Sequence, residues 1–176
     1  MPATPLHFGF AIFLFSILPF MDPIALLIGV AIIDLEPFFY MITGIGQLHG
    51  IMHSILGMLV FFIPTTFISW SCYKLFKLER YLPKFKIYIS LLSGIVGLFS
   101  HVFFDGILYP EIMFVYPFSK QAGMLYNIIP SSAVYWILVI MLFVGIAILV
   151  LRYYLKLLWK KREETNPTLL EGRINI

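Results

Sequence analysis

Long uninterrupted apolar runs dominate the hydrophobic pattern of this chain. Three of them, residues 51–73, 87–108 and 133–151, are long enough to cross about 30 Å of hydrocarbon, which takes about 20 helical residues. The pattern therefore predicts three membrane-spanning helices. We expect a kink at Pro64 in the first span and a continuation of the third helix to Lys161.

Two shorter apolar runs, residues 6–18 and 24–33, precede the long ones. Pro19 and Pro23 separate them, together with Asp22, which we expect to cap the second short helix. Runs of about 10–14 residues more often re-enter the membrane or pack inside a bundle than span it. We therefore expect an all-α integral membrane protein, a bundle of about five helices with a short N-terminal helical hairpin and three long transmembrane spans.

Composition supports a membrane location and one domain. Hydrophobic residues make up 61% of the chain and charged residues 12%, against roughly 25% charged residues in soluble domains. We expect one transmembrane domain over residues 1–161 and a polar, frayed tail over residues 162–176. The single Cys72 excludes an internal disulfide framework. No charged segment precedes the first apolar run, so we expect no cleavable signal peptide.

The placement of basic residues predicts the orientation in the membrane. Five of them fill the connection between the first two long spans, and five follow the third span (Lys74, Lys77, Arg80, Lys84, Lys86, Arg152, Lys156, Lys160, Lys161 and Arg162). By the positive-inside rule, we expect a protein of the cell membrane in which this connection and the C-terminus face the cytoplasm. Residues 34–50 and 109–132 then face outward. The formal charge of +3 is no signal for nucleic acid, so membrane lipid is the expected partner.

Histidines and carboxylates stand out against this apolar background. No Lys or Arg precedes Lys74, yet this part of the chain holds three carboxylates and three histidines (Asp22, Asp34, Glu36, His7, His49 and His53). Burying an unpaired, ionised carboxylate costs several kcal/mol. These groups must therefore be protonated, reach water or share a cation. Ionisable residues inside a membrane are candidates for a functional site.

The spacing of these groups favours the cation. His101 and Asp105 are four residues apart on a predicted helix and therefore share one face, and His49 and His53 have the same spacing. Asp34 and Glu36 end the second short run, where Pro37 is expected to force the chain out of the helix. In the predicted orientation all of these groups, and His7, reach the outer level of the membrane.

Imidazole and carboxylate groups together suit zinc, iron or manganese. We predict a site for one or two divalent ions, with zinc preferred, whose candidate ligands are His7, Asp34, His49, His53, His101 and Asp105. A single histidine on an apolar helix is more often a core residue than a ligand, and the convergence of many such groups is what favours a metal. Glu111 is expected to lie in a solvated loop instead.

Four stretches of the first 120 or so residues carry a resemblance to a known family: TPLHFG, IIDLEPFF, LHGIMHSILG and SHVFFDGILYPE. In this order and approximate spacing, the chain resembles the YdjM-like family of membrane-bound, metal-dependent hydrolases. The resemblance implies that His7, Asp34, His53, His101 and Asp105 belong to a metal site. Glu36 stands where that family usually has a second Asp, and His49 stands where it usually has an Arg.

The leading hypothesis is a membrane metal-dependent hydrolase that acts on a lipid-like ester or phosphoester through a metal-activated water. Its candidate catalytic groups are Asp34 and Glu36. The base is expected to be Glu36, or another carboxylate that does not bind the metal. Two alternatives stay open: an ion or proton carrier or channel that uses the same groups, and a non-catalytic membrane protein with a structural metal.

Overall fold

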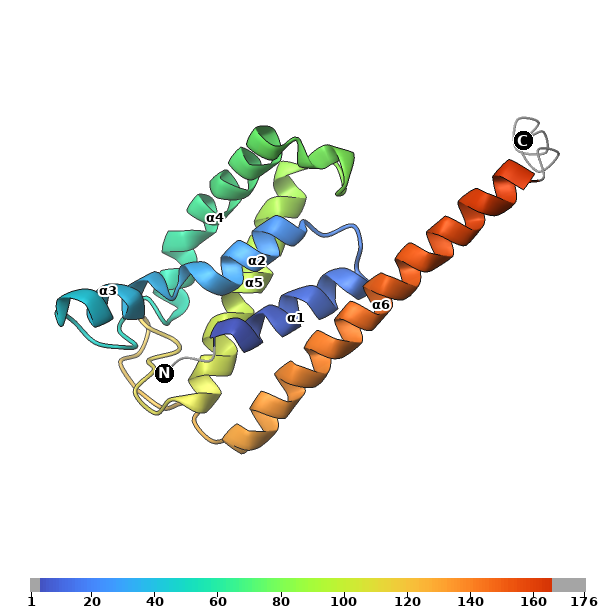
Figure 1. Cartoon of the computed structure of the whole chain (residues 1–176). Helices are drawn as coiled ribbons and strands as arrows, with labels where there is room; N and C mark the ends of the chain where they lie inside the picture. Colours follow the sequence, from blue (N-terminus) through green and yellow to red (C-terminus); the bar gives the residue numbers. More distant parts are fainter. Residues whose placement is uncertain (1–3, 166–176) are drawn as a thin grey trace.

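The computed structural model describes residues 4–165, and every regular element in this part of the chain is a helix (Figure 1). The elements are α1 (Thr4–Ile17), α2 (Pro23–Ile32), α3 (Leu35–Thr43), α4 (Ile55–Phe76), the short 3-10 helix η1 (Leu78–Arg80), α5 (Ile87–Leu108) and α6 (Ser131–Thr165). The predicted all-α fold is confirmed.

Four helical segments, rather than the predicted three, are long and apolar enough to cross a membrane: residues 23–43, 55–76, 87–108 and 131–162. This indicates membrane insertion. The additional segment combines α2 and α3, which are joined by a turn at Ile33 and Asp34.

The expected effect of Pro37 was wrong, because the chain resumes a helix at Leu35 and Pro37 is buried in the first turn of α3. The N–H groups of a first turn have no partner within the helix, so a proline, which lacks this group, is tolerated there. Pro64 lies in the middle of α4, and the helix continues beyond it to Phe76.

The predicted break between the two short helices is confirmed, and Asp22 caps α2 as expected. Its Oδ1 accepts hydrogen bonds from the N–H groups of Ile24 (2.9 Å) and Ala25 (3.1 Å). Its Oδ2 accepts a bond from the hydroxyl of Ser69 on α4 (2.6 Å), and its own N–H donates to the hydroxyl of Ser93 on α5 (2.9 Å). One buried aspartate thus joins the beginning of α2 to two long helices.

The two short helices pack mainly against different long helices. In Figure 1, α1 lies along the first half of α6, while α2 crosses α5. A Cβ atom on Gly29 would lie 2.6 Å from the carbonyl oxygen of Gly94, and one on Gly97 would lie 2.5 Å from that of Leu26. Small residues therefore allow the α2 and α5 backbones to touch, as is common between membrane helices.

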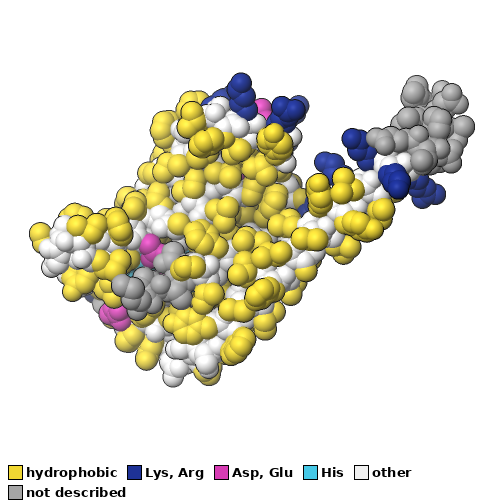
Figure 2. Space-filling model, viewed as in Figure 1, with side chains coloured by type: hydrophobic (Ala, Val, Ile, Leu, Met, Phe, Trp, Pro, Cys, Tyr) yellow, Lys and Arg dark blue, Asp and Glu magenta, His cyan; other side chains and the backbone are white. Residues whose placement is uncertain are grey.

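Charged side chains are distributed unevenly over the bundle. Figure 2 shows Lys and Arg on the connection between α4 and α5 and on the far part of α6. Acidic side chains are visible near α3, at the other end of the bundle. Helix α6 runs past the predicted end at Lys161 to Thr165, and the rest of the expected tail, residues 166–176, lies outside the described residues.

The crossing of α2 and α5 generates a prediction about stability. Gly97→Val would push two backbones apart, so we expect a loss of about 1–3 kcal/mol, the usual cost of overpacking. Ile95→Val, on α5 at a side chain that is 45% exposed, should stay within about 0.5 kcal/mol. Thermal unfolding in detergent measures both changes, and equal effects of the two variants would show that the glycine crossing is unimportant.

Candidate metal centre

The site begins with two side chains on the buried face of α5. His101 and Asp105 are separated by one helical turn and both are 0% exposed. The Nε2 atom of His101 lies 3.1 Å from Oδ2 of Asp105. Their shared face confirms that the spacing of four residues brings the two groups together.

Two further groups come from elsewhere in the chain. Asp34 lies at the turn between α2 and α3, and His53 lies just before α4. Asp34 Oδ1 is 3.4 Å from His101 Nε2 and 3.7 Å from His53 Nε2, and the latter is 3.8 Å from Asp105 Oδ2. Each of Asp34, His53, His101 and Asp105 offers one ligand atom, and these atoms lie within 4.8 Å of one another. We call these four residues the metal-ligand cluster.

His7 reaches the edge of this cluster from α1. Its Nε2 lies 3.2 Å from Oδ1 of Asp105, and its ring stacks on that of His101 with the centroids 4.7 Å apart. The structure therefore places His7 beside the cluster, although it is not one of the four mutually close groups.

Glu36 makes contacts that orient a member of the cluster. Its Oε2 lies 3.0 Å from Nδ1 of His53 and accepts a hydrogen bond from the N–H of Gly50 (3.0 Å), while Oε1 accepts one from the N–H of Met52 (3.2 Å). With the proton on Nδ1, His53 turns its Nε2 towards the cluster. Carboxylates commonly hold metal-binding histidines in this way. These contacts make Glu36 a positioning residue for His53, and its role as a base stays a prediction.

His49 lies next to the cluster but has a different carboxylate partner. Its Nδ1 is 2.7 Å from Oε1 of Glu111, and its ring stacks on Tyr109 with the centroids 4.1 Å apart. The His49 and His53 ring centroids are 5.0 Å apart. Glu111 is 47% exposed, as expected for a loop, but its pairing with His49 was not predicted.

The electrostatic environment at the edge of the cluster favours positive charge. Burial acts to lower the pKa of His53, but the carboxylates of Asp34 and Glu36 act more strongly in the opposite direction, so this pKa is raised above its ordinary value. Burial, reinforced by the charge of Asp105, raises the pKa of the Tyr109 hydroxyl. The carboxylates thus stabilise a positive charge nearby, whether a proton or a metal ion carries it.

The donor atoms of the cluster fit a shared metal ion. Within the described residues, neither oxygen of Asp105, neither ring nitrogen of His101 nor Nε2 of His53 makes a hydrogen bond of acceptable geometry. The separations of 3.1–3.8 Å within the cluster lie around the roughly 3.3 Å between ligands of a tetrahedral zinc ion with bonds of about 2.0–2.1 Å. Donor atoms that lie this close together without bonding to one another can share one ion, and mixed nitrogen and oxygen donors suit a transition metal.

The fold and the cluster define a helical membrane protein with a candidate buried metal centre. No protein-family model, curated protein or solved structure matches the chain. The evidence for the site is therefore the geometry of the chain itself.

Four of the six predicted ligands form the cluster, while His7 and His49 lie at its margin. The contact of Glu36 with His53 and that of Glu111 with His49 were missed. The sequence does place Glu36 in an acidic pair beside Asp34, but the separation of 62 residues between His49 and Glu111 leaves no local signal.

A pair of carboxylate variants tests the location of the metal. Asp105→Asn removes a fully buried charge from the cluster, so metal content after purification should fall strongly. Glu111→Gln, outside the cluster, should retain most of the metal. Elemental analysis of the detergent-purified proteins measures both, and equal losses would mean that the site has been misplaced.

The orienting role of Glu36 gives a separate prediction. Glu36→Ala leaves the cluster's donor atoms in place but frees the His53 ring, so metal affinity should fall about 10- to 100-fold. Glu79→Ala, in η1, should leave the affinity unchanged. Competition with a chromogenic chelator gives the dissociation constants, and an unaltered affinity for Glu36→Ala would contradict the assignment.

Proposed function

We propose that this protein is an integral membrane, metal-dependent hydrolase of lipid-like esters or phosphoesters. The observation that carries the proposal is the buried cluster of two imidazoles and two carboxylates. In this proposal the basic ends of the bundle face the cytoplasm and the cluster lies towards the outer face of the cell membrane. The motif resemblance to the YdjM-like hydrolases supports the same reaction class.

Asp34, His53, His101 and Asp105 would hold the metal, with His7 available beside Asp105. When bound, such an ion lowers the pKa of a coordinated water to about 7 and makes it a nucleophile at neutral pH. Zinc is the preferred ion because imidazole and carboxylate groups are both among its usual ligands.

The chain's own residues would position the reaction and accept its proton. Glu36 fixes the ring of His53, as described above. The side chain of Glu36 is 20% exposed, whereas both carboxylate oxygens of Asp34 and those of Asp105 are buried. Glu36 is therefore the carboxylate of the site that can pass a proton to water. We assign proton transfer to Glu36.

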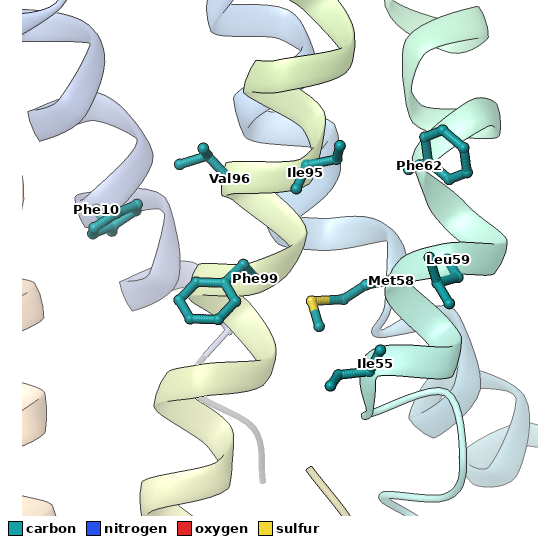
Figure 3. Close-up of a pocket in the computed structure, with 8 residues that line it drawn as sticks. All are labelled: Phe10, Ile55, Met58, Leu59, Phe62, Ile95, Val96 and Phe99. Carbon is teal, nitrogen blue, oxygen red and sulfur yellow. The ribbon is translucent and has the colours of Figure 1, made fainter. Parts of the chain in front are cut away.

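An apolar cavity of about 470 Å³ between α4 and α5 supports a lipid-like substrate (Figure 3). Its lining includes Ile55 at the start of α4 and Phe99 on α5. Pockets of this size commonly hold small molecules. An alkyl chain is the ligand that such apolar walls accept in a bilayer.

A structural metal is the second candidate, because the cluster supplies four groups, the number that closes structural zinc sites. Such sites usually depend on cysteine, whereas this cluster has two carboxylates and no cysteine. These features favour a catalytic ion.

The distribution of buried polar groups argues against a carrier. The nearest other buried carboxylate, Asp22, is bound to Ser93, which lies eight residues from His101, or about 12 Å along α5. Between these levels the buried side chains include Leu26, Val30 and Leu98 and the hydroxyls of Thr65 and Ser100, but among the described residues no ionisable group. A path for ions or protons would need ionisable groups there. Flux of protons or metal ions across the membrane of liposomes that contain the protein would instead support the carrier hypothesis.

An activity assay tests the proposal. The protein in vesicles should hydrolyse a fluorogenic long-chain ester or phosphoester, and a chelator should stop the reaction until zinc is restored. His101→Ala should reduce turnover more than about 100-fold, beyond the effect of losing an outer-sphere partner. Glu79→Gln is the control, because Glu79 lies in η1 beside basic residues and is not a member of the metal-ligand cluster. Turnover that survives both chelation and His101→Ala would contradict the proposal, and a metal-loaded protein inactive on both substrate classes would favour the structural role.

A further inference from the structure

Helix α3 projects from the bundle (Figure 1), and none of the extensive helix–helix contacts in the described part of the chain involves it. Its large apolar side chains recur at the spacing of one helical face and are 54–68% exposed: Leu35, Phe38, Phe39 and Ile42. We call these four side chains the apolar stripe. A helix of a water-soluble protein turns such a stripe towards the core, whereas here it faces outward.

The chain leaves α3 through an exposed segment without regular structure, residues 44–47, which we call the return segment. The N–H groups of Gly46 and Gln47 have no hydrogen-bond partner among the described residues. Unsatisfied backbone groups are costly in hydrocarbon, so irregular segments that face lipid do not occur there. The return segment therefore requires water or lipid headgroups around it.

The metal-ligand cluster fixes the depth at which α3 begins. Asp34 directly precedes α3, and its Oδ1 lies 3.4 Å from Nε2 of His101. Asp105 and His101 are three and seven residues from the end of α5 at Leu108, or about 5 and 10 Å along the helix. Since the 22 residues of α5 match the hydrocarbon thickness, α3 begins about 5–10 Å inside its edge. Interfacial helices bury their apolar face to this depth.

The apolar stripe needs hydrocarbon and the return segment needs water, and the two requirements are met together at the membrane interface. Residues 37–48 carry no charged side chain that a charged protein surface could recognise. Acyl chains already surround the apolar helices of a membrane bundle, so they are the ligand at hand for the stripe. We propose that α3 and the return segment lie in the lipid leaflet at the cluster end of the bundle, with the stripe among acyl chains and the return segment among headgroups.

Glu36 fastens this interfacial element to the metal site at both ends. It lies in the first turn of α3, and its carboxylate accepts hydrogen bonds from the N–H groups of Gly50 and Met52, which follow the return segment. Residues 23–43 are long enough to cross a membrane, but in this proposal they do not form one continuous span. The proposal does not depend on which reaction the metal site performs.

A tryptophan probe measures the depth of the apolar stripe. The three native tryptophans are replaced by phenylalanine, and Ile42→Trp is compared with Ile63→Trp, a control at a similarly exposed position (61%) eight residues into α4. The variants are reconstituted into vesicles of brominated phosphatidylcholine. Bromine near the start of the acyl chains should quench Ile42→Trp about twofold more than bromine near their ends, because interfacial helices reach only about 5–10 Å deep. Ile63→Trp should show the reverse order.

The other outcomes would overturn the proposal. Stronger quenching of Ile42→Trp by the deep bromine would show that α3 continues as a membrane span. Quenching by aqueous iodide without quenching by bromine would place the stripe in water. Protection from both quenchers would show that protein covers the stripe, and its relief on dilution of the protein in lipid would identify a second copy of the chain.

Thiol labelling tests the return segment separately. In a Cys72→Ser background, Gln47→Cys should react with a membrane-impermeant maleimide supplied on both sides of the vesicles, whereas Ile63→Cys should not. An unreactive Gln47→Cys would place the return segment away from water and contradict the proposal. Because Gln47 is an exposed polar side chain, this variant remains decisive if a tryptophan variant fails to fold.

Discussion

The carboxylate of Asp105 in the apolar interior is the constraint on which the rest of the site depends. It is fully buried, and within the described residues no Lys or Arg pairs with it. Histidine nitrogens from three elements surround it instead: His7, His53 and His101. An isolated buried carboxylate is costly by several kcal/mol. A cation shared among these groups would offset that cost and would account for the convergence of polar side chains in an otherwise apolar bundle.

The helix packing serves this convergence. The contact of Gly29 and Gly97 brings α2 against α5 and so carries Asp34 towards His101. At the other end of α2, Asp22 binds groups of α4 and α5 and fixes the same helix. A carboxylate therefore lies at each end of α2: Asp22 makes hydrogen bonds at the beginning, and Asp34 belongs to the cluster at the end.

The sequence was sufficient for the three long helical spans and for the pairing of His101 with Asp105, because hydrophobic length and a four-residue spacing are local signals. It was insufficient for α3, since Pro37 is compatible with either a helix end or a first turn. The partnership of His49 with Glu111 joins residues far apart in the chain and follows from the path of the loops, which no periodicity encodes. Glu36 adopts an orienting role for the same reason: the fold of residues 44–54 returns His53 and two backbone N–H groups to it.

X-ray absorption at the edge of the metal that co-purifies with the protein tests the central claim most directly. A metal held by Asp34, His53, His101 and Asp105 requires a shell of nitrogen and oxygen atoms with the scattering pattern of about two imidazoles and, for zinc, bonds near 2.0–2.1 Å. Protein without stoichiometric metal, or a spectrum with sulfur ligands or without imidazole, would contradict the account.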